Sequence, residues 1–266
     1  MGRMLAWQLS QHGHKVSVFD RDTANAGAAA GYTAAGMLTP YTEAESAEEI
    51  IFKLGKRSLT LWPKLISELH KPVRYNKKGS LVVAHPNDTQ DLLHFKSQVT
   101  HKLQPNKQAF VDLDKKGIAE LEPELSQTFS TAYYLPDEAW VSSNDFMRAS
   151  LTTALALGAQ WHEQAEVLAV ENGCIKTKEK THQFDLAIDT RGLGAKPQWG
   201  ELRGVRGELI WLQAPEVNIT RLVRLMHPRY RLYLAPTQKD DMYILGATQI
   251  ESDDTSAMSV LSLIHI

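Results

Sequence analysis

The sequence predicts an α/β fold in which a Rossmann-like nucleotide-binding part is interleaved with an antiparallel, β-rich part. Three observations support this prediction. The chain opens with an amphipathic helical pattern and then a short apolar strand that ends in a carboxylate, Asp20. Segments rich in glycine and alanine follow at 24–40 and 191–195. Residues 207–248 are dominated by β-type runs. Mixed α/β followed by antiparallel β is typical of two intertwined domains.

Composition narrows the class of protein. With 266 residues the chain can form one large domain or two interleaved ones with a real core. The net charge of −2 gives no electrostatic footprint for nucleic acid or anionic lipid, so we expect neither partner. The single cysteine, Cys174, excludes an intrachain disulfide framework and fits a reducing cytoplasm. The histidines are scattered, with no HExxH and no CxxC, and we expect no metal site.

The first two elements are the helix and strand of a βαβ unit. Residues 3–12 place apolar side chains four positions apart on one helical face, and residues 15–20 form a β-branched strand. A complete unit also has an earlier strand and a glycine-rich turn, whose backbone approaches a pyrophosphate at the helix N-terminus. Only the last glycine of that turn, Gly2, is present. We therefore expect a chain that is truncated at its start.

Asp20 is a candidate nucleotide ligand. A carboxylate at the end of the second strand of such a unit accepts hydrogen bonds from ribose hydroxyls. The alternative is a strand-end aspartate that caps a turn with Asp22 and Thr23. In the segment that follows, Gly31 and Gly36 argue against one long helix and indicate backbone packed closely against something flat.

The remaining elements follow in chain order. We expect helices at 47–69, interrupted near Pro63, at 88–103, in a short stretch ending at 121–125, and at 145–157, the last capped by Ser143 or Asn144. We expect strands at 74–84 (two, around a Lys-Gly turn), 131–134, 158–161, 165–170, 184–190 (buried), 207–213, 230–235 and 242–248. Residues 256–266 begin a helix with no cap or polar tail, so we expect a truncated tail as well.

The segment Thr33-Ala34-Ala35-Gly36-Met37-Leu38, about a dozen residues past Asp20, resembles the D-amino-acid oxidase family of FAD enzymes. Further stretches that are similar to the family are 79–84, 121–123, 185–195 and 204–208, so the resemblance covers nearly the whole chain. The family usually has Ala-Ala-Gly where this chain has Thr190-Arg191-Gly192. Within the family, the Ala-Ala-Gly-Met-Leu run is most similar to the members that oxidise glycine in the thiamine pathway.

The resemblance implies FAD as cofactor and assigns roles to particular positions. Gly2 would be the last glycine of the phosphate turn, and Asp20, with Arg21 beside it, would bind the ribose. Ala30 and Gly31 would approach the phosphates, Ala35, Gly36 and Met37 would present backbone to the isoalloxazine ring, and Val167 would offer backbone groups to the adenine. For each position the alternative is plain core packing.

Substrate residues are expected on the strand 230–235. Alternation puts Arg229, Arg231 and Tyr233 on one face, and guanidinium groups with a phenol suit an amino-acid carboxylate. The alternative is a solvated sheet face. The resemblance makes Tyr233 the catalytic and substrate-contacting residue, with Arg231 beside it. It places Gln249 at the pocket wall, where the family pattern has methionine, which leaves the preferred substrate size open.

The activity implied is oxidation of glycine or a similar small amino acid to the imine. The hydride passes to the flavin, and O2 reoxidises it with release of H2O2, in thiamine thiazole synthesis. One alternative is oxidation of sarcosine or another secondary amine. Another is the FAD domain of a tRNA-modifying enzyme, which would need a basic surface that the net charge of −2 does not supply. A third is a non-catalytic fragment.

The resemblance also predicts the layout of the chain. An FAD-binding domain would comprise 1–45 and 145–205, a substrate-binding domain 46–144 and 206–255, and a truncated tail 256–266. The family's carboxylate-binding arginine falls beyond residue 266, so we expect these residues alone to bind FAD weakly and to show no oxidase activity. Family members are often homo-oligomers, so a homo-oligomer is a possible assembly.

Overall fold

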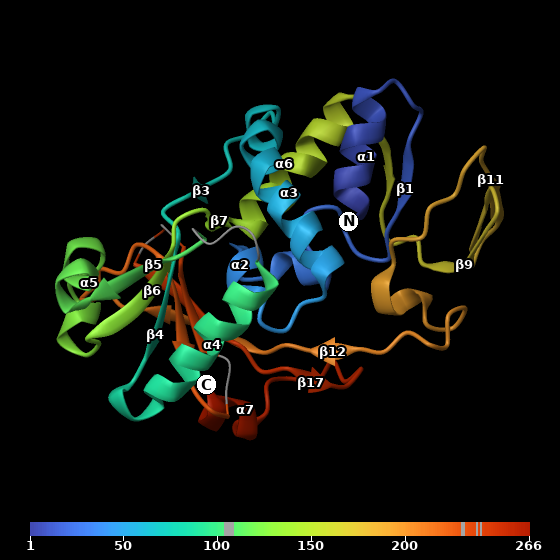
Figure 1. Ribbon diagram of the computed structural model, residues 1–266. Coiled ribbons are helices and arrows are strands. Elements are labelled where there is room, and N and C mark those ends of the chain that lie inside the picture. The colour runs from blue at the N-terminus through green and yellow to red at the C-terminus, as the bar shows by residue number, and fades with distance from the viewer. Residues whose placement is uncertain (104–108, 230–231, 238, 240) are drawn as a thin grey trace.

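The computed structural model describes residues 1–103, 109–229, 232–237, 239 and 241–266. Two groups of elements lie side by side in Figure 1, a helical group around α1, α6 and β1 and a large sheet flanked by α4 and α5. The α/β fold predicted from the sequence is confirmed. The strand-rich part combines pieces that are distant in sequence, as expected for an interleaved chain.

The helical group contains the helix and the strand of the predicted βαβ unit. Strand β1 pairs in parallel with β8, and α1 packs against α6. Trp7 and Ala154 lie at the centre of their shared core, with no exposed surface. The elements are α1 (Gly2–Gln11), β1 (Ser17–Phe19), α6 (Ser143–Ala156), β8 (Gln160–His162) and a small antiparallel sheet of β9 (Val167–Glu171), β10 (Cys174–Thr177) and β11 (Thr181–Gln183).

The large sheet has seven strands in the order β13-β16-β15-β14-β4-β6-β5, and only the β14–β4 pair is parallel. Successive side chains of β4 point to opposite faces of the sheet, and a helix packs on each face. Val82 packs with Phe95 of α4, whereas Leu81 and Val83 pack on the face that α5 covers. The elements are β4 (Ser80–Ala84), α4 (Thr89–Lys102), β5 (Val111–Asp114), α5 (Lys115–Leu121), β6 (Thr131–Leu135), β13 (Leu209–Gln213), β14 (Leu222–Met226), β15 (Leu232–Pro236) and β16 (Met242–Gly246).

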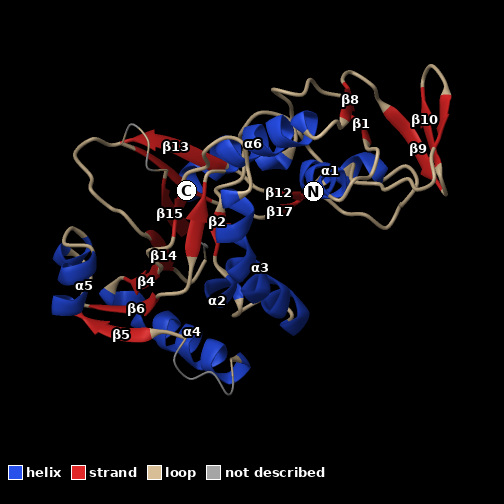
Figure 2. Ribbon diagram, turned by 90° about the horizontal axis from the view of Figure 1, so that it is seen from above, coloured by secondary structure: helices blue, strands red, loops and turns tan. Residues whose placement is uncertain are grey.

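A further small sheet joins the two groups. Its order is β2-β7-β3, and the helices α2 and α3 follow β2 along the chain. Helix α3 contacts both groups, because Leu59 belongs to the core under the large sheet and Leu65 packs against the core of α1 and α6. Figure 2 shows β2 and α2 between the large sheet and α6. The elements are β2 (Met37–Leu38), α2 (Pro40–Glu43), α3 (Glu49–Ser67), β3 (Tyr75–Asn76) and β7 (Ala139–Val141).

The remaining elements are short. The strands β12 (Val205–Arg206) and β17 (Ile250–Glu251) pair with each other, and α7 (Val260–His265) ends the chain. Single 3₁₀ turns are η1 (Ala30–Tyr32), η2 (Pro86–Asp88), η3 (Leu125–Gln127) and η4 (Gly192–Ala195). Within the described residues, no helix combines the length and the apolar character that crossing a bilayer requires.

The expected strand at 184–190 is wrong. These residues form no regular element, and a cleft of about 1080 Å³ separates them from β1. The apolar side chains of Leu186 and Ile188, which suggested a buried strand, are exposed. An extended segment becomes a strand only when a neighbour exchanges successive hydrogen bonds with it. Among the described residues of this segment, only the N–H of Phe184 has a backbone acceptor, the carbonyl of Gly173 at 2.8 Å.

Two smaller expectations also change. Helix α3 runs through Pro63 without interruption. Pro63 is exposed, so its ring has room, and the helix loses one backbone hydrogen bond at that position. The cap of α6 is Ser142, whose hydroxyl accepts from the backbone N–H of Asp145, rather than Ser143 or Asn144.

Candidate functional site

The segment Ala34–Met37 is held by its carbonyl groups. The Ser143 hydroxyl donates to the carbonyl of Ala34 at 2.8 Å, and the Trp140 indole donates to that of Ala35 at 2.7 Å. The backbone N–H of Val141 donates to the carbonyl of Gly36 at 2.9 Å. Three successive carbonyls therefore point toward β7 and the start of α6.

The backbone N–H groups of this segment are less fully paired than its carbonyls. Among the described residues, no group accepts a hydrogen bond from the backbone N–H of Ala35 or Gly36. Backbone donors in a folded protein are almost always paired, so two neighbouring donors without partners mark a place for an acceptor from outside the chain. This row of N–H groups fits the heteroatom edge of a flavin ring.

The backbone conformation and the surroundings of position 36 both require a glycine. Its φ of +77° lies in the left-handed region, which residues with a Cβ rarely adopt. A Cβ at this position would also lie 1.9 Å from the carbonyl oxygen of Val141, well inside contact distance. The sequence can bring the two backbones this close only without a side chain.

Asp20 follows β1 directly. Its backbone is bound to the neighbouring strand and loop, since its N–H donates to His162 and its carbonyl accepts from Ala165. One carboxylate oxygen accepts the N–H of Asp22 at 3.1 Å, as in the turn-capping alternative. The other oxygen has no partner among the described residues. Asp20 thus serves as a turn cap and still has an acceptor for a ribose hydroxyl, while Arg21 is exposed beside it.

Arg3 connects α1 to the loop after Asp20. It is buried, and it donates to the carbonyls of Ala24 at 2.7 Å and Met147 at 2.8 Å. Its guanidinium also lies 5.2 Å from the centre of the Tyr32 ring. A Cβ on Gly31 would meet the sulfur of Met147 at 2.8 Å, so η1 lies directly on α6. These contacts tie the loop after Asp20 and η1 to α1 and α6.

Of three further predicted cofactor positions, Gly2 and Val167 line the cleft beside β1, whereas Ala30 lies in η1. Ala30 is exposed in η1, next to Gly31. Gly2 begins α1, where a Cβ would lie 2.8 Å from the hydroxyl of Thr190. Val167 begins β9, and its carbonyl already accepts from Arg191 at 3.0 Å, which leaves one lone pair for another donor.

Tyr233 lies beside the segment Ala34–Met37. It packs with Met37 against the buried cluster of Ala35, Trp140 and Ala235. Among the residues that the structure describes, none hydrogen-bonds the phenol oxygen. Burial raises the pKa of Tyr233, and the carboxylate of Glu43 raises it further. The phenol therefore stays protonated and able to donate over the neutral pH range.

The other two predicted substrate residues are Arg231 and Gln249. Arg231 lies outside the described residues. Gln249 is exposed in the loop between β16 and β17. Of the predicted face, Tyr233 alone is joined to the segment 35–37 by the described structure.

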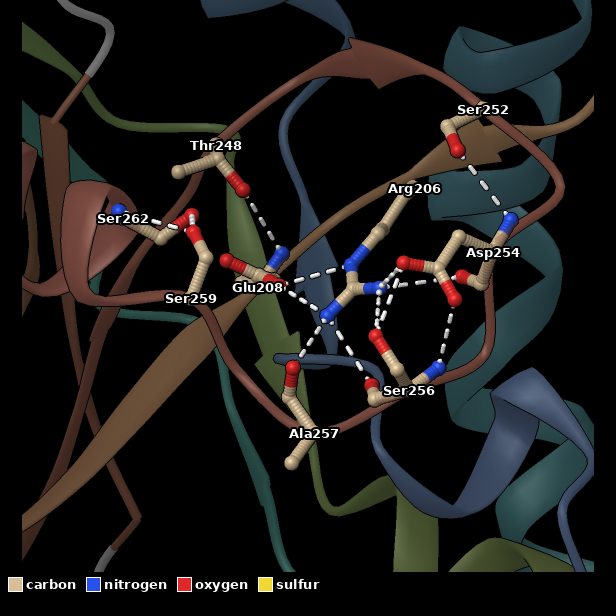
Figure 3. Close-up of polar contacts among 9 residues, drawn as sticks. All are labelled: Arg206, Glu208, Thr248, Ser252, Asp254, Ser256, Ala257, Ser259 and Ser262. Atoms are coloured by element: carbon tan, nitrogen blue, oxygen red, sulfur yellow. Dashed lines mark hydrogen bonds and ion pairs between the residues drawn. The ribbon is translucent and has the colours of Figure 1, made fainter.

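The stretch 204–208, which resembles the family, takes part in a polar cluster with the C-terminal segment (Figure 3). Arg206 donates to Glu208 at 2.6 Å and to the carboxylate of Asp254 at 2.9 Å. It also donates to the carbonyls of Ser256 and Ala257. Because one guanidinium binds so many groups of 254–257, its role here is to hold the C-terminal segment against β12.

Sequence reasoning missed the residues that support the site. Trp140 and Ser143 bind carbonyls that lie more than a hundred positions earlier in the chain, and no local pattern indicates such pairs. Arg3 looked like an ordinary exposed helix residue, although it is buried. Arg3 directly follows Gly2, and this position next to the predicted phosphate turn is the one sequence signal that could have indicated its role.

Comparison with known proteins gives a consistent result. A model of the family described as FAD dependent oxidoreductase matches residues 1–262. A protein of Rhizobium etli named as the thiamine biosynthesis oxidoreductase ThiO is 33% identical over 265 residues, which is 100% of this chain and 73% of that protein.

Solved structures share the fold. Glycine oxidase from Geobacillus kaustophilus superposes with a TM-score of 0.80 at 22% identity, covering 99% of this chain and 72% of the other. Iminodiacetate oxidase from Chelativorans sp. BNC1 gives a TM-score of 0.79 at 20% identity, covering 99% and 73%. At such identities the similarity shows the fold and leaves the substrate open.

Proposed function

The chain belongs to the family of FAD-dependent oxidoreductases, and we propose that within this family it oxidises the C–N bond of a small amino acid, glycine being the first candidate. The observation that carries this proposal is that unpaired backbone donors and an unpaired phenol lie together. Unpaired backbone donors at Ala35 and Gly36 lie in one cluster with the free phenol of Tyr233. A planar cofactor and a small carboxylate substrate need such a pairing.

The predicted cofactor positions would hold FAD. Asp20 accepts from the adenosine ribose, and the exposed, small residues around Ala30 and Gly31 allow backbone to approach the phosphates. The N–H groups of Ala35 and Gly36 donate to the ring, with Met37 beside it. Gly2, Arg21 and Val167 complete the predicted contacts at the two ends of the adenosine half.

The chemistry requires positioning more than acid–base catalysis. When bound, FAD supplies the acceptor for a hydride from the substrate carbon. The Tyr233 hydroxyl donates a hydrogen bond to the substrate carboxylate and thereby orients the reacting C–H bond. Its neighbours Trp140 and Ala35 are buried and exclude water from that side. Arg231 and Gln249 remain proposed substrate contacts.

The proposed domain division follows the packing only in part. Residues 1–45 with 145–205 form the proposed FAD-binding domain, and 46–144 with 206–255 the substrate-binding domain. The core of α1 with α6 supports the first grouping and the seven-stranded sheet the second. Helix α3, which the division gives to the substrate domain, contacts both.

We further propose O2 as the oxidant that returns the flavin to its starting state, with a role in thiamine synthesis in the cytoplasm. The R. etli relative carries that pathway in its name, and the free, buried Cys174 is compatible with a reducing compartment. Peroxide is then the co-product. A homo-oligomer stays a possible assembly.

The test is reduction of FAD bound to the purified protein with any residues that flank 1–266 included, because residues 1–266 alone are expected to bind FAD weakly and to show no oxidase activity. Reduction is followed by absorbance under anaerobic conditions with glycine, sarcosine or iminodiacetate. We expect glycine to bleach the flavin fastest and peroxide to form when air is admitted. Faster reduction by sarcosine or iminodiacetate would shift the substrate class to secondary amines. Absence of bound flavin, or of reduction by all three amines, would overturn the proposal.

A further inference from the structure

Glu138 is a buried carboxylate that the proposed chemistry does not use, and it lies close to the chain that follows the segment Ala34–Met37. Glu138, in the turn between β6 and β7, has no exposed surface. Its carboxylate accepts from the backbone N–H of Thr42 at 2.6 Å and from the Thr42 hydroxyl at 2.6 Å. The Ser80 hydroxyl donates to it as well. Two of its three partners therefore belong to one residue, Thr42, at the end of α2.

Thr42 is held from the other side by a buried cation. The guanidinium of Arg224 donates to the carbonyl of Thr42 at 2.6 Å and to the Glu45 carboxylate at 2.5 Å. Arg224 is 7% exposed and lies 5.3 Å from the centre of the Phe95 ring. Every polar group of Thr42 thus binds a buried charged side chain, which is far more than a four-residue helix needs for its own stability.

The same arginine is a direct neighbour of the proposed substrate residue. Arg224 of β14 and Tyr233 of β15 form a cross-strand pair, so their side chains lie on the same face of the sheet. Thr42 is only a few residues beyond Met37, and Glu43 next to it is close enough for its charge to raise the pKa of Tyr233. The clamp on Thr42 therefore connects the strand that carries Tyr233 to the segment that carries Met37.

We propose that Glu138 and Arg224 are positioning residues for the reaction: by binding Thr42 from opposite sides, they fix the segment 37–43 at the spacing from Tyr233 that a small carboxylate requires. The proposal rests on the function proposed above, since it takes this segment to face the flavin. Glu138 and Arg224 act through Thr42 and do not themselves touch the substrate.

The chain offers a matched control. Glu122 is also a buried carboxylate, and it accepts from the N–H and hydroxyl of Thr220 and from Arg221. It follows α5, on the opposite side of the large sheet from Arg224 and Phe95. Removing it breaks an equivalent network with no contact to the segment 37–43.

The first experiment measures binding to the FAD-loaded protein with acetate, a carboxylate that has no amine to oxidise, by the shift in flavin absorbance. We expect Glu138→Ala to weaken acetate binding roughly three- to tenfold and Thr42→Val to act in the same direction, because each removes a buried hydrogen bond of the clamp. Glu138→Gln should stay within about twofold, since an amide can still accept from Thr42 and donate to a hydroxyl. Glu122→Ala should leave acetate affinity unchanged.

The second experiment separates this proposal from the proposed function. Amide hydrogen exchange of a peptide covering 37–45 is measured without any ligand, so it does not depend on FAD or substrate. Faster exchange in Glu138→Ala and Thr42→Val, but not in Glu122→Ala, is the expected result. Unchanged exchange in both clamp variants, or an equal loss of acetate affinity in Glu122→Ala, would overturn the proposal. If the wild-type protein binds no FAD, the proposed function fails while the exchange result still decides whether the clamp exists.

Discussion

At the scale of single residues, Gly36 is the position where backbone geometry and the candidate site coincide. Its left-handed φ of +77° and the 1.9 Å approach to the Val141 carbonyl are separate demands. Gly158 has only the first, since its φ is +90° and nothing lies within 4 Å of a Cβ built there. The two glycines therefore separate backbone strain from steric conflict.

Gly36→Ala is predicted to destabilise the protein more than Gly158→Ala and to abolish FAD binding. The strain of a left-handed alanine costs about 1–2 kcal/mol at either site, and at Gly36 the clash with Val141 adds to it. Urea unfolding gives the free energies, and quenching of flavin fluorescence gives the affinity. Equal destabilisation by the two substitutions, with FAD affinity kept, would contradict the geometry described for the segment 34–37.

Tyr233→Phe is predicted to raise KM more than it lowers kcat, because the phenol orients the substrate and does not react. Loss of one hydrogen bond to a charged carboxylate corresponds to roughly tenfold or more in KM. Steady-state peroxide formation, measured on the protein with any residues that flank 1–266 included, gives both constants. Tyr134→Phe is the control: its hydroxyl donates to the carbonyl of Lys78 on the other face of the sheet. A KM that stays at the wild-type value would remove Tyr233 from the substrate site.

At the scale of elements, the sequence predicted what local pattern encodes. Helix α1 and strand β1 were found from periodicity because the spacing of apolar side chains that predicts each of them lies within a few neighbouring residues. The predicted strand 184–190 failed because strand formation depends on a neighbour that local pattern does not reveal. The two-residue strand β2 escaped prediction, since its partner β7 is about a hundred residues away.

The candidate site shows the same division. The glycine at position 36 could be found in the sequence because a special backbone conformation restricts the residue type. The side chains that hold it could not. Trp140 has the pattern of an ordinary core residue, and Glu138 that of a turn residue, although it is completely buried. Their roles arise only when distant elements meet.

Glu138 also gives the junction of α2, β4 and β7 a pH dependence. Burial raises the pKa of Glu138 to about 7, hydrogen bonds from Ser80 and Thr42 oppose this, and the charge of Glu43 adds to it. The other titratable groups nearby are Tyr41 and Asp137. Because the pKa in the folded protein lies above that of the unfolded chain, the native state binds more protons between the two values. Stability from this group therefore falls as pH rises from about 4.5 to 7.

Glu138→Gln is predicted to remove this slope. The difference in unfolding free energy between the variant and the wild type should shift in favour of the variant by about 3 kcal/mol between pH 4.5 and 7, and then stay constant. Urea unfolding at pH 5, 6, 7 and 8 measures it. Glu122→Gln, at another buried carboxylate, serves as the comparison. A difference that does not vary with pH would show that the Glu138 carboxyl ionises normally.

At the scale of the whole molecule, the proposed cofactor site spans two structural groups. Asp20 belongs to the sheet of β1 and β8, whereas Ala35 and Tyr233 belong to a cluster built on the large sheet. The link between them is the loop 24–32, which Arg3 ties to α1 and Met147 supports from α6. A dinucleotide bound across both would cross-link the two groups, whereas half of it would stabilise only one.

This arrangement predicts that the two halves of FAD can be separated by one substitution. At a hundred times its dissociation constant a ligand stabilises the native state by about 2.7 kcal/mol, so thermal unfolding reports each affinity. Asp20→Asn removes a charged acceptor for the ribose and should weaken both FAD and ADP by roughly tenfold or more. Riboflavin has no adenosine ribose and depends on the segment 35–37, so its effect on Tm should be unchanged. If Asp20→Asn reduced the riboflavin effect as much as the ADP effect, the two halves would not occupy separate places. The surface from Asp20 to Met37 would then not be one dinucleotide site.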